Sequence, residues 1–161
     1  MPGSHDPKSD ATSAGGLNNG CLAQLVGYAS SRAALQLRKV FLKHMDPLEL
    51  KVVEFSILVL VASNARINQK QLGQALDVSA PNLAVILDKL AERDLIERVR
   101  STVDRREQLL HLTPKGAQVT TRAEAIAATM EVDALRMLSD AERALLIELL
   151  MKVARGRAGK R

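Results

Sequence analysis

Apolar residues recur every three or four positions along most of the chain, which is the period of an α-helix. Residues 21–45 alternate apolar and basic side chains at this spacing and predict a long amphipathic helix. A break at residues 46–47 separates it from residues 48–63, which are so apolar that we expect a helix at the centre of the molecule. Two more helices are predicted, over residues 113–138 and 139–154. The chain is therefore expected to be mainly α-helical.

Two short helices joined by a tight turn are predicted in the middle of the chain. Asn68 is a suitable N-cap for the first, with Gln71 in the position of a capping box. After a turn at residues 77–78, Ser79 is placed to cap the second helix, and Pro81 falls in its first turn, where a missing amide costs nothing. This order predicts a helix-turn-helix.

The periodicity then changes to that of strands. Residues 95–100 and 108–112 are strand-like, and the polar segment between them predicts a β-hairpin with a long charged loop. The loop carries the run Asp104, Arg105 and Arg106. A helix-turn-helix followed at once by a charged hairpin is the order of a winged helix, so the predicted fold is mainly α with a small β-hairpin wing.

Net charge adds little to this picture. The chain of 161 residues has a formal charge of +5, but the tail at residues 155–161 supplies four of these charges, and removing it leaves +1. Any case for a nucleic-acid partner must therefore rest on where the charges lie. Residues 1–19 are polar and rich in Gly and Asn, which predicts a flexible arm.

No constellation typical of an enzyme is present. The chain lacks a glycine-rich phosphate loop, a nucleophile elbow and a metal-spaced His or Cys cluster, so we expect no catalysis, cofactor or metal. Cys21 is the only cysteine, which excludes an internal disulfide. Because no apolar stretch could cross a bilayer and no signal peptide is apparent, a cytoplasmic protein without membrane contact is expected.

The segment from residue 90 to residue 116 resembles the multiple antibiotic resistance regulator (MarR) family. The resemblance is carried by the passage 90–98, the Asp104-Arg105-Arg106 wing and the exit Leu110-His111-Leu112-Thr113-Pro114-Lys115-Gly116. The order of helices is similar over residues 21–154.

The resemblance implies a homodimer and a double-stranded DNA partner. Residues 20–47 and 117–154 would be dimerisation helices, and residues 48–116 the DNA-binding lobe. Recognition helices would enter successive major grooves of a pseudo-palindromic site, and wings the flanking minor grooves. The implied function is that of a transcriptional regulator. Within the family, the commoner mode of action is repression, with a small effector releasing the protein from its operator.

The outward face of the recognition helix is expected to touch DNA through Ser79, Pro81, Asn82, Ala84, Val85 and Lys89. Relatives commonly have an arginine where Val85 stands, so bidentate guanine readout is not expected. Asn82 suits an adenine edge, and Ala84 and Val85 suit thymine methyl groups, which leads to the hypothesis of an A·T-rich site. The alternative is that Ala84 and Val85 pack on a neighbouring element, and we give it the same weight as contact with thymine.

Basic residues of the hairpin form the second predicted contact. Arg105 and Arg106 suit a narrow minor groove, with Asp104 holding an arginine in place. Arg98 and Arg100 are candidates for phosphate contacts. A solvated charged loop is the alternative.

Residues of the first two long helices are candidates for binding an aromatic or carboxylate-containing effector: Tyr28, Arg32, Phe41, His44 and Phe55. Arg32 is the best single candidate for an anionic group. Phe41 and Phe55 are more simply explained as core residues, and His44 as a residue that caps the end of its helix, where the dipole favours a cation.

Two alternative interpretations of the function remain open. Cys21 lies near the predicted start of the first helix, and a peroxide-sensing branch of the family has a cysteine in a comparable place. Its tyrosine partners are missing from residues 48–63, so an incidental cysteine is favoured. A winged helix that binds another protein instead of DNA is the second alternative.

Overall fold

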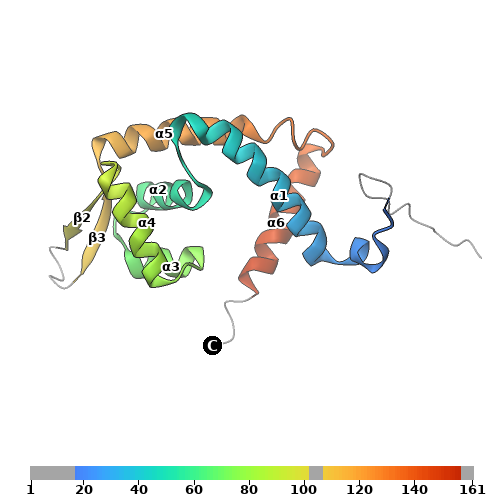
Figure 1. Cartoon of the computed structure of the whole chain (residues 1–161), viewed down its shortest axis with the longest axis horizontal. Helices are drawn as coiled ribbons and strands as arrows, with labels where there is room; N and C mark the ends of the chain where they lie inside the picture. The colour runs from blue at the N-terminus through green and yellow to red at the C-terminus, as the bar shows by residue number, and fades with distance from the viewer. Residues whose placement is uncertain (1–16, 102–106, 157–161) are drawn as a thin grey trace, which may run out of the picture. The chain divides into compact units, whose positions relative to one another are not determined.

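The computed structural model describes residues 17–101 and 107–156 (Figure 1). In chain order the elements are η1 (Gly20–Gln24), α1 (Val26–Met45), η2 (Asp46–Leu48), α2 (Val52–Ser63), β1 (Ile67–Asn68), α3 (Gln69–Leu76), α4 (Ala80–Glu92), β2 (Ile96–Arg100), β3 (Gln108–Leu112), α5 (Pro114–Met130) and α6 (Asp140–Arg155), where η marks a 3-10 turn. The chain divides into two compact units between Leu37 and Arg38, inside α1. Most of the predicted N-terminal arm and of the basic tail lies outside the described ranges.

The predicted helix-turn-helix is formed by α3 and α4. Asn68 caps α3, because its Oδ1 accepts from the Gln71 amide at 2.9 Å while Gln71 Oε1 accepts from the Asn68 amide at 3.0 Å. Asp77, with φ of 51°, turns the chain in the left-handed conformation. Ser79 occupies the N-cap position of α4 as expected, but its side chain makes no capping hydrogen bond.

A small antiparallel sheet has the strand order β1-β3-β2. Its hairpin pairs Ile96 with Leu112 and Arg100 with Gln108, so β2 begins one residue later than predicted and β3 where predicted. The third strand, β1, was not predicted, because two residues are too short for a recognisable alternation. Through the pair Ile67 and Leu110 it joins the segment before α3 to the wing.

The core of the second unit lies where the helix-turn-helix meets α2. Ile57 and Leu58 of α2, Leu72 of α3, and Leu83 and Leu87 of α4 are completely buried. Helix α2 also contacts β3 and α5, and α4 contacts β2. Because both α3 and β2 contact the apolar side of α4, the orientation of its opposite face is fixed relative to the hairpin.

The end of the hairpin is bound closely to α5. Thr113 caps α5 through the Gly116 amide at 2.9 Å, and its hydroxyl donates to the Asp94 carbonyl at 2.6 Å. The Thr113 amide also donates to the Leu95 carbonyl at 3.2 Å. Gly116 is buried against Leu95 so closely that a Cβ there would lie 2.7 Å from the Leu95 carbonyl carbon. Only glycine fits at this position without a backbone shift.

Three predicted helix boundaries were wrong. Helix α1 begins at Val26, because Leu25 is extended and residues 20–24 form the separate turn η1. Helix α2 begins at Val52, after η2 and the left-handed Glu49. Helix α5 ends at Met130, and the segment up to residue 138 forms turns.

Within the described ranges, none of the helices has the length and apolar character needed to cross a membrane.

Candidate nucleic-acid interface

Helix α4 presents a polar and small-residue face opposite its buried stripe. Along this face Ser79, Pro81, Asn82 and Lys89 are exposed, and Ala84 is half-buried. Val85 is 54% exposed, which argues against the alternative that it packs on a neighbouring element of this chain. The candidate reading residues therefore share one accessible helix face.

A charged pair joins this face to the wing. Arg98 Nη2 of β2 lies 2.7 Å from Asp88 Oδ1 of α4, and the two side chains are 31% and 58% exposed. This exposure keeps the contribution to stability small. Arg98, predicted as a phosphate contact, is thus already paired with the recognition helix, whereas Arg100 on the same strand is exposed.

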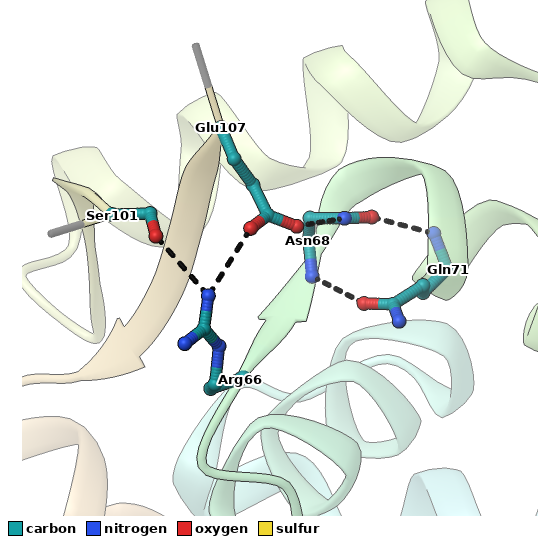
Figure 2. A network of polar contacts seen from close by, with 5 residues as sticks. All are labelled: Arg66, Asn68, Gln71, Ser101 and Glu107. Atoms are coloured by element: carbon teal, nitrogen blue, oxygen red, sulfur yellow. Dashed lines mark hydrogen bonds and ion pairs between the residues drawn. The ribbon is translucent and has the colours of Figure 1, made fainter. Parts of the chain in front are cut away.

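The tip of the wing, with Asp104, Arg105 and Arg106, lies outside the described residues. Its two flanking residues are described and belong to a polar network (Figure 2). Arg66 Nη2 donates to Ser101 Oγ at 3.2 Å and lies 3.5 Å from Glu107 Oε2. The second carboxylate oxygen of Glu107 accepts from Asn68 Nδ2 at 2.7 Å.

Sequence reasoning missed Arg66 and Glu107. Glu107 falls in the charged loop that was treated as one segment, and its partners lie 39 and 41 positions away. No local spacing rule connects residues so distant in the chain. The short strand β1, which pairs with β3, could not be recognised from the sequence either.

A second set of contacts that the sequence did not reveal holds the C-terminal end of α4. Arg93 donates to the carbonyls of Glu49 and Leu48, both at 2.9 Å, and its Nη1 lies 3.7 Å from Glu54 Oε2. The same carboxylate oxygen accepts from the Lys51 amide at 2.9 Å, at the start of α2. The recognition helix is therefore bound at its C-terminal end to the turn between α1 and α2.

The aromatic candidates for an effector site pack on each other. The ring centroids of Phe41 and Phe55 are 5.7 Å apart with an interplanar angle of 55°. Phe41 is buried, and Phe55 packs against the same core cluster. This contact agrees with the interpretation of both rings as core residues.

The polar candidates are more accessible. His44 is exposed in the last turn of α1 and its Nδ1 lies 2.9 Å from the Val40 carbonyl, as expected for a histidine at a helix end. Tyr28 is half-buried and Arg32 exposed, and both belong to the unit before residue 38.

Cys21 is exposed in η1. The argument from an α-helix N-terminus therefore does not apply to it, since α1 starts five residues later.

A helix-turn-helix followed by a β-hairpin, whose strand β3 also pairs with β1, defines this protein as a winged helix-turn-helix protein. A family model of the MarR family matches residues 50–108. The HTH-type transcriptional regulator YpoP of Bacillus subtilis (strain 168) is 31% identical over 127 residues, which cover 75% of this chain and 90% of YpoP. The chain belongs to the MarR family of transcriptional regulators.

Two further relatives extend the comparison. A transcriptional regulatory protein for the hcr operon of Thauera aromatica is 37% identical over 101 residues, and the match covers 63% of this chain and 61% of that protein. The transcriptional repressor CouR bound to a 23-mer DNA duplex has a TM-score of 0.81 at 36% identity, covering 86% of this chain and 99% of CouR. CouR bound to p-coumaroyl-CoA has a TM-score of 0.78 at 34% identity, with 86% and 98% covered.

Proposed function

We propose that this protein is a homodimeric repressor that binds a pseudo-palindromic operator through α4 and the wing, and that a small effector releases it. The observation that carries the proposal is the accessible face of α4 next to the wing strands. The similarity to CouR in its DNA complex supports it, because that match covers nearly the whole of CouR. A footprint on genomic fragments tests the proposal directly.

The first turns of α4 would read the major groove. Asn82 can pair with an adenine edge, and the exposed methyl groups of Val85 suit thymine. We therefore expect an A·T-rich operator. A footprint centred on G·C-rich half-sites would contradict this part of the proposal.

The wing would supply minor-groove and phosphate contacts through Arg105 and Arg106. Salt titration of a variant with both arginines changed to alanine is the test. If each arginine releases about one counterion on binding, the slope of log K against log salt should fall in magnitude by about two. An unchanged slope would remove the wing from the interface.

Uncovered apolar surface supports the homodimer. Helix α6 has no buried residue, and its large apolar side chains from Leu145 to Val153 are 38–68% exposed. A helix with so much uncovered apolar surface is expected to pack on a partner. A second copy of the chain, contacted through residues 20–47 and 117–154, is the partner we propose. Sedimentation at micromolar concentration checks the mass.

The proposed effector is an aromatic acid or its coenzyme A thioester, because the similar CouR has been observed with p-coumaroyl-CoA. Tyr28 can stack on a ring, and the exposed Arg32 can pair with a carboxylate or a phosphate. The footprint repeated with free acids, thioesters and coenzyme A alone separates these ligands. Arg32→Ala should weaken release by the charged ligand and leave DNA binding without ligand unchanged.

A gel-shift assay distinguishes the hypothesis of a DNA-binding regulator from the alternative of a protein-binding adaptor. Failure to find any bound DNA fragment at low salt would favour an adaptor. A regulator of this kind would act in the cytoplasm, where it has access to the chromosome, and would need no enzymatic activity. Mild peroxide treatment of the unaltered protein and of Cys21→Ser tests the redox alternative, and equal DNA binding before and after oxidation would reject it.

A further inference from the structure

The two residues that flank the wing loop are held by one guanidinium group. Ser101 and Glu107 are joined by a backbone hydrogen bond of 2.9 Å from the Ser101 amide to the Glu107 carbonyl. Arg66, directly before β1, reaches the hydroxyl of Ser101 and the carboxylate of Glu107 with the same Nη2 atom. Figure 2 shows this guanidinium pointing between the two strand ends. The entrance and exit of the loop are therefore fixed together.

The network continues from the wing into the helix-turn-helix. Asn68 donates from Nδ2 to Glu107 at 2.7 Å, and its Oδ1 is the acceptor that caps α3. Gln71 completes the capping box from the other side. One amide side chain thus serves both the first helix of the helix-turn-helix and the base of the wing.

Glu107 is an unexpected residue at this place in a DNA-binding protein. A carboxylate beside a DNA-binding surface is repelled by phosphate groups. Its side chain is 31% exposed and that of Arg66 is 52% exposed, so the ion pair adds little to folding stability. Neither affinity by charge nor stability explains the carboxylate, whereas its two partners, Arg66 and Asn68, give it a geometric role between the hairpin and the helix-turn-helix.

We propose that Glu107 is a positioning residue for the wing, which with Arg66 and Asn68 fixes the stem of the loop relative to the recognition unit. The inference rests on the proposed function, since it requires the wing to contact DNA. Its distinctive consequence is that the effect of the Glu107 charge on DNA affinity has the opposite sign to the one that electrostatics alone would give. Removing this negative charge weakens DNA binding, although electrostatic attraction alone would strengthen it.

Glu107→Gln is the first variant. The amide offers one oxygen where the carboxylate offered two, so either Arg66 or Asn68 loses its acceptor. We expect DNA binding to weaken by about three- to tenfold, with a smaller salt slope and an unchanged midpoint of chemical unfolding. The matched control is Glu97→Gln on β2, an exposed carboxylate outside the network, which should bind equally well or about twofold more tightly.

A rescue experiment tests the geometry independently of charge. Asn68→Asp keeps the capping oxygen of α3 but sets two carboxylates against each other, so it should weaken DNA binding more than Glu107→Gln does. In the double variant the amide of Gln at position 107 donates to the new carboxylate and its oxygen accepts from Arg66. The net charge of the double variant equals that of the unaltered protein, one unit more negative than Glu107→Gln and one unit more positive than Asn68→Asp. Recovery of DNA affinity above both single variants is the expected result.

The wing arginines supply the last comparison. In a background with Arg105 and Arg106 changed to alanine, Glu107→Gln should cause no further loss, because it acts through the wing. If the arginine variant binds DNA like the unaltered protein, the proposed wing contact is itself wrong. If that variant binds weakly but Glu107→Gln binds as tightly as the unaltered protein, only the positioning role is overturned. An unrescued double variant, or equal losses in both backgrounds, also overturns it.

Discussion

The close approach of Gly116 to Leu95 leads to the sharpest prediction on stability. An alanine Cβ at position 116 would lie 2.7 Å from the Leu95 carbonyl carbon and 3.1 Å from its Cα, whereas ordinary contacts begin at 3.4 Å. The obstacle is backbone, so no side-chain rotation can relieve it. The chain at Leu95 must move by more than half an ångström, and Leu95 directly precedes the first wing strand.

This movement acts on the hydrogen bonds that join the wing to α5. The Leu95 carbonyl accepts from the Thr113 amide at 3.2 Å, and the adjacent Asp94 carbonyl accepts from the Thr113 hydroxyl at 2.6 Å. Overpacking costs about 1–3 kcal/mol, and each weakened hydrogen bond about 1 kcal/mol. We therefore expect Gly116→Ala to lower the free energy of unfolding by about 3–5 kcal/mol, a large part of a typical total of about 5–15 kcal/mol.

Urea unfolding followed by circular dichroism measures this difference at constant m-value. Gly73→Ala in α3 is the matched control, because its Cβ would lie 3.2 Å from the Val78 carbonyl oxygen and would gain about 0.5–1 kcal/mol of helix propensity. Its unfolding free energy should stay within about 1 kcal/mol of the unaltered protein. A Gly116→Ala protein as stable as this control would refute the reasoning.

Three further predictions concern exposed groups. Val85→Arg should tighten DNA binding or shift the footprint towards guanine, and an unchanged footprint and affinity would count against a base contact at this position. Asp88→Asn should release Arg98 for phosphate contact, giving tighter binding and a salt slope steeper by about one; equal slopes would show that Arg98 stays away from DNA. Hydrogen bonds from the backbone amide and then the hydroxyl of Ser139 lower the pKa of Glu142 in the folded protein. The ionised carboxylate therefore stabilises the start of α6 at pH values above the pKa of Glu142 in the unfolded chain. This stabilisation is lost as the pH falls through the lowered pKa of the folded protein. Ser139→Ala removes the hydroxyl but keeps the backbone amide, so the pKa of Glu142 should return only part of the way towards its ordinary value in an NMR titration, and an unmoved titration would contradict the contribution of the hydroxyl.

Local features of the fold were predictable from the sequence. The cap of α3 involves residues three positions apart, and its capping box forms as predicted; the capping box of α6 has the same spacing. The strands of the hairpin were placed to within one residue because alternation of apolar and polar positions is also a local signal. Short-range spacing rules were sufficient for these elements.

The contacts that orient the wing and the recognition helix were not predictable in this way. Arg66 and Glu107 are 41 positions apart, and Arg93 contacts carbonyls 44 and 45 positions earlier. A charged residue on a helix or loop offers no signal in a single sequence about which distant partner it will meet. The start of α1 was missed for a different reason, since the apolar spacing continues unbroken through Leu25, where the backbone is extended.

The uncovered apolar side chains of α6 make protein concentration a thermodynamic variable. If the folded state is completed only by a second copy, the equilibrium between folded pairs and unfolded chains follows mass action, and dilution alone lowers the melting temperature. The number of molecules in the cell would then determine both how much of the regulator is folded and how much can span two half-sites. Changes in synthesis or turnover would act on repression more steeply than in proportion to the amount of protein.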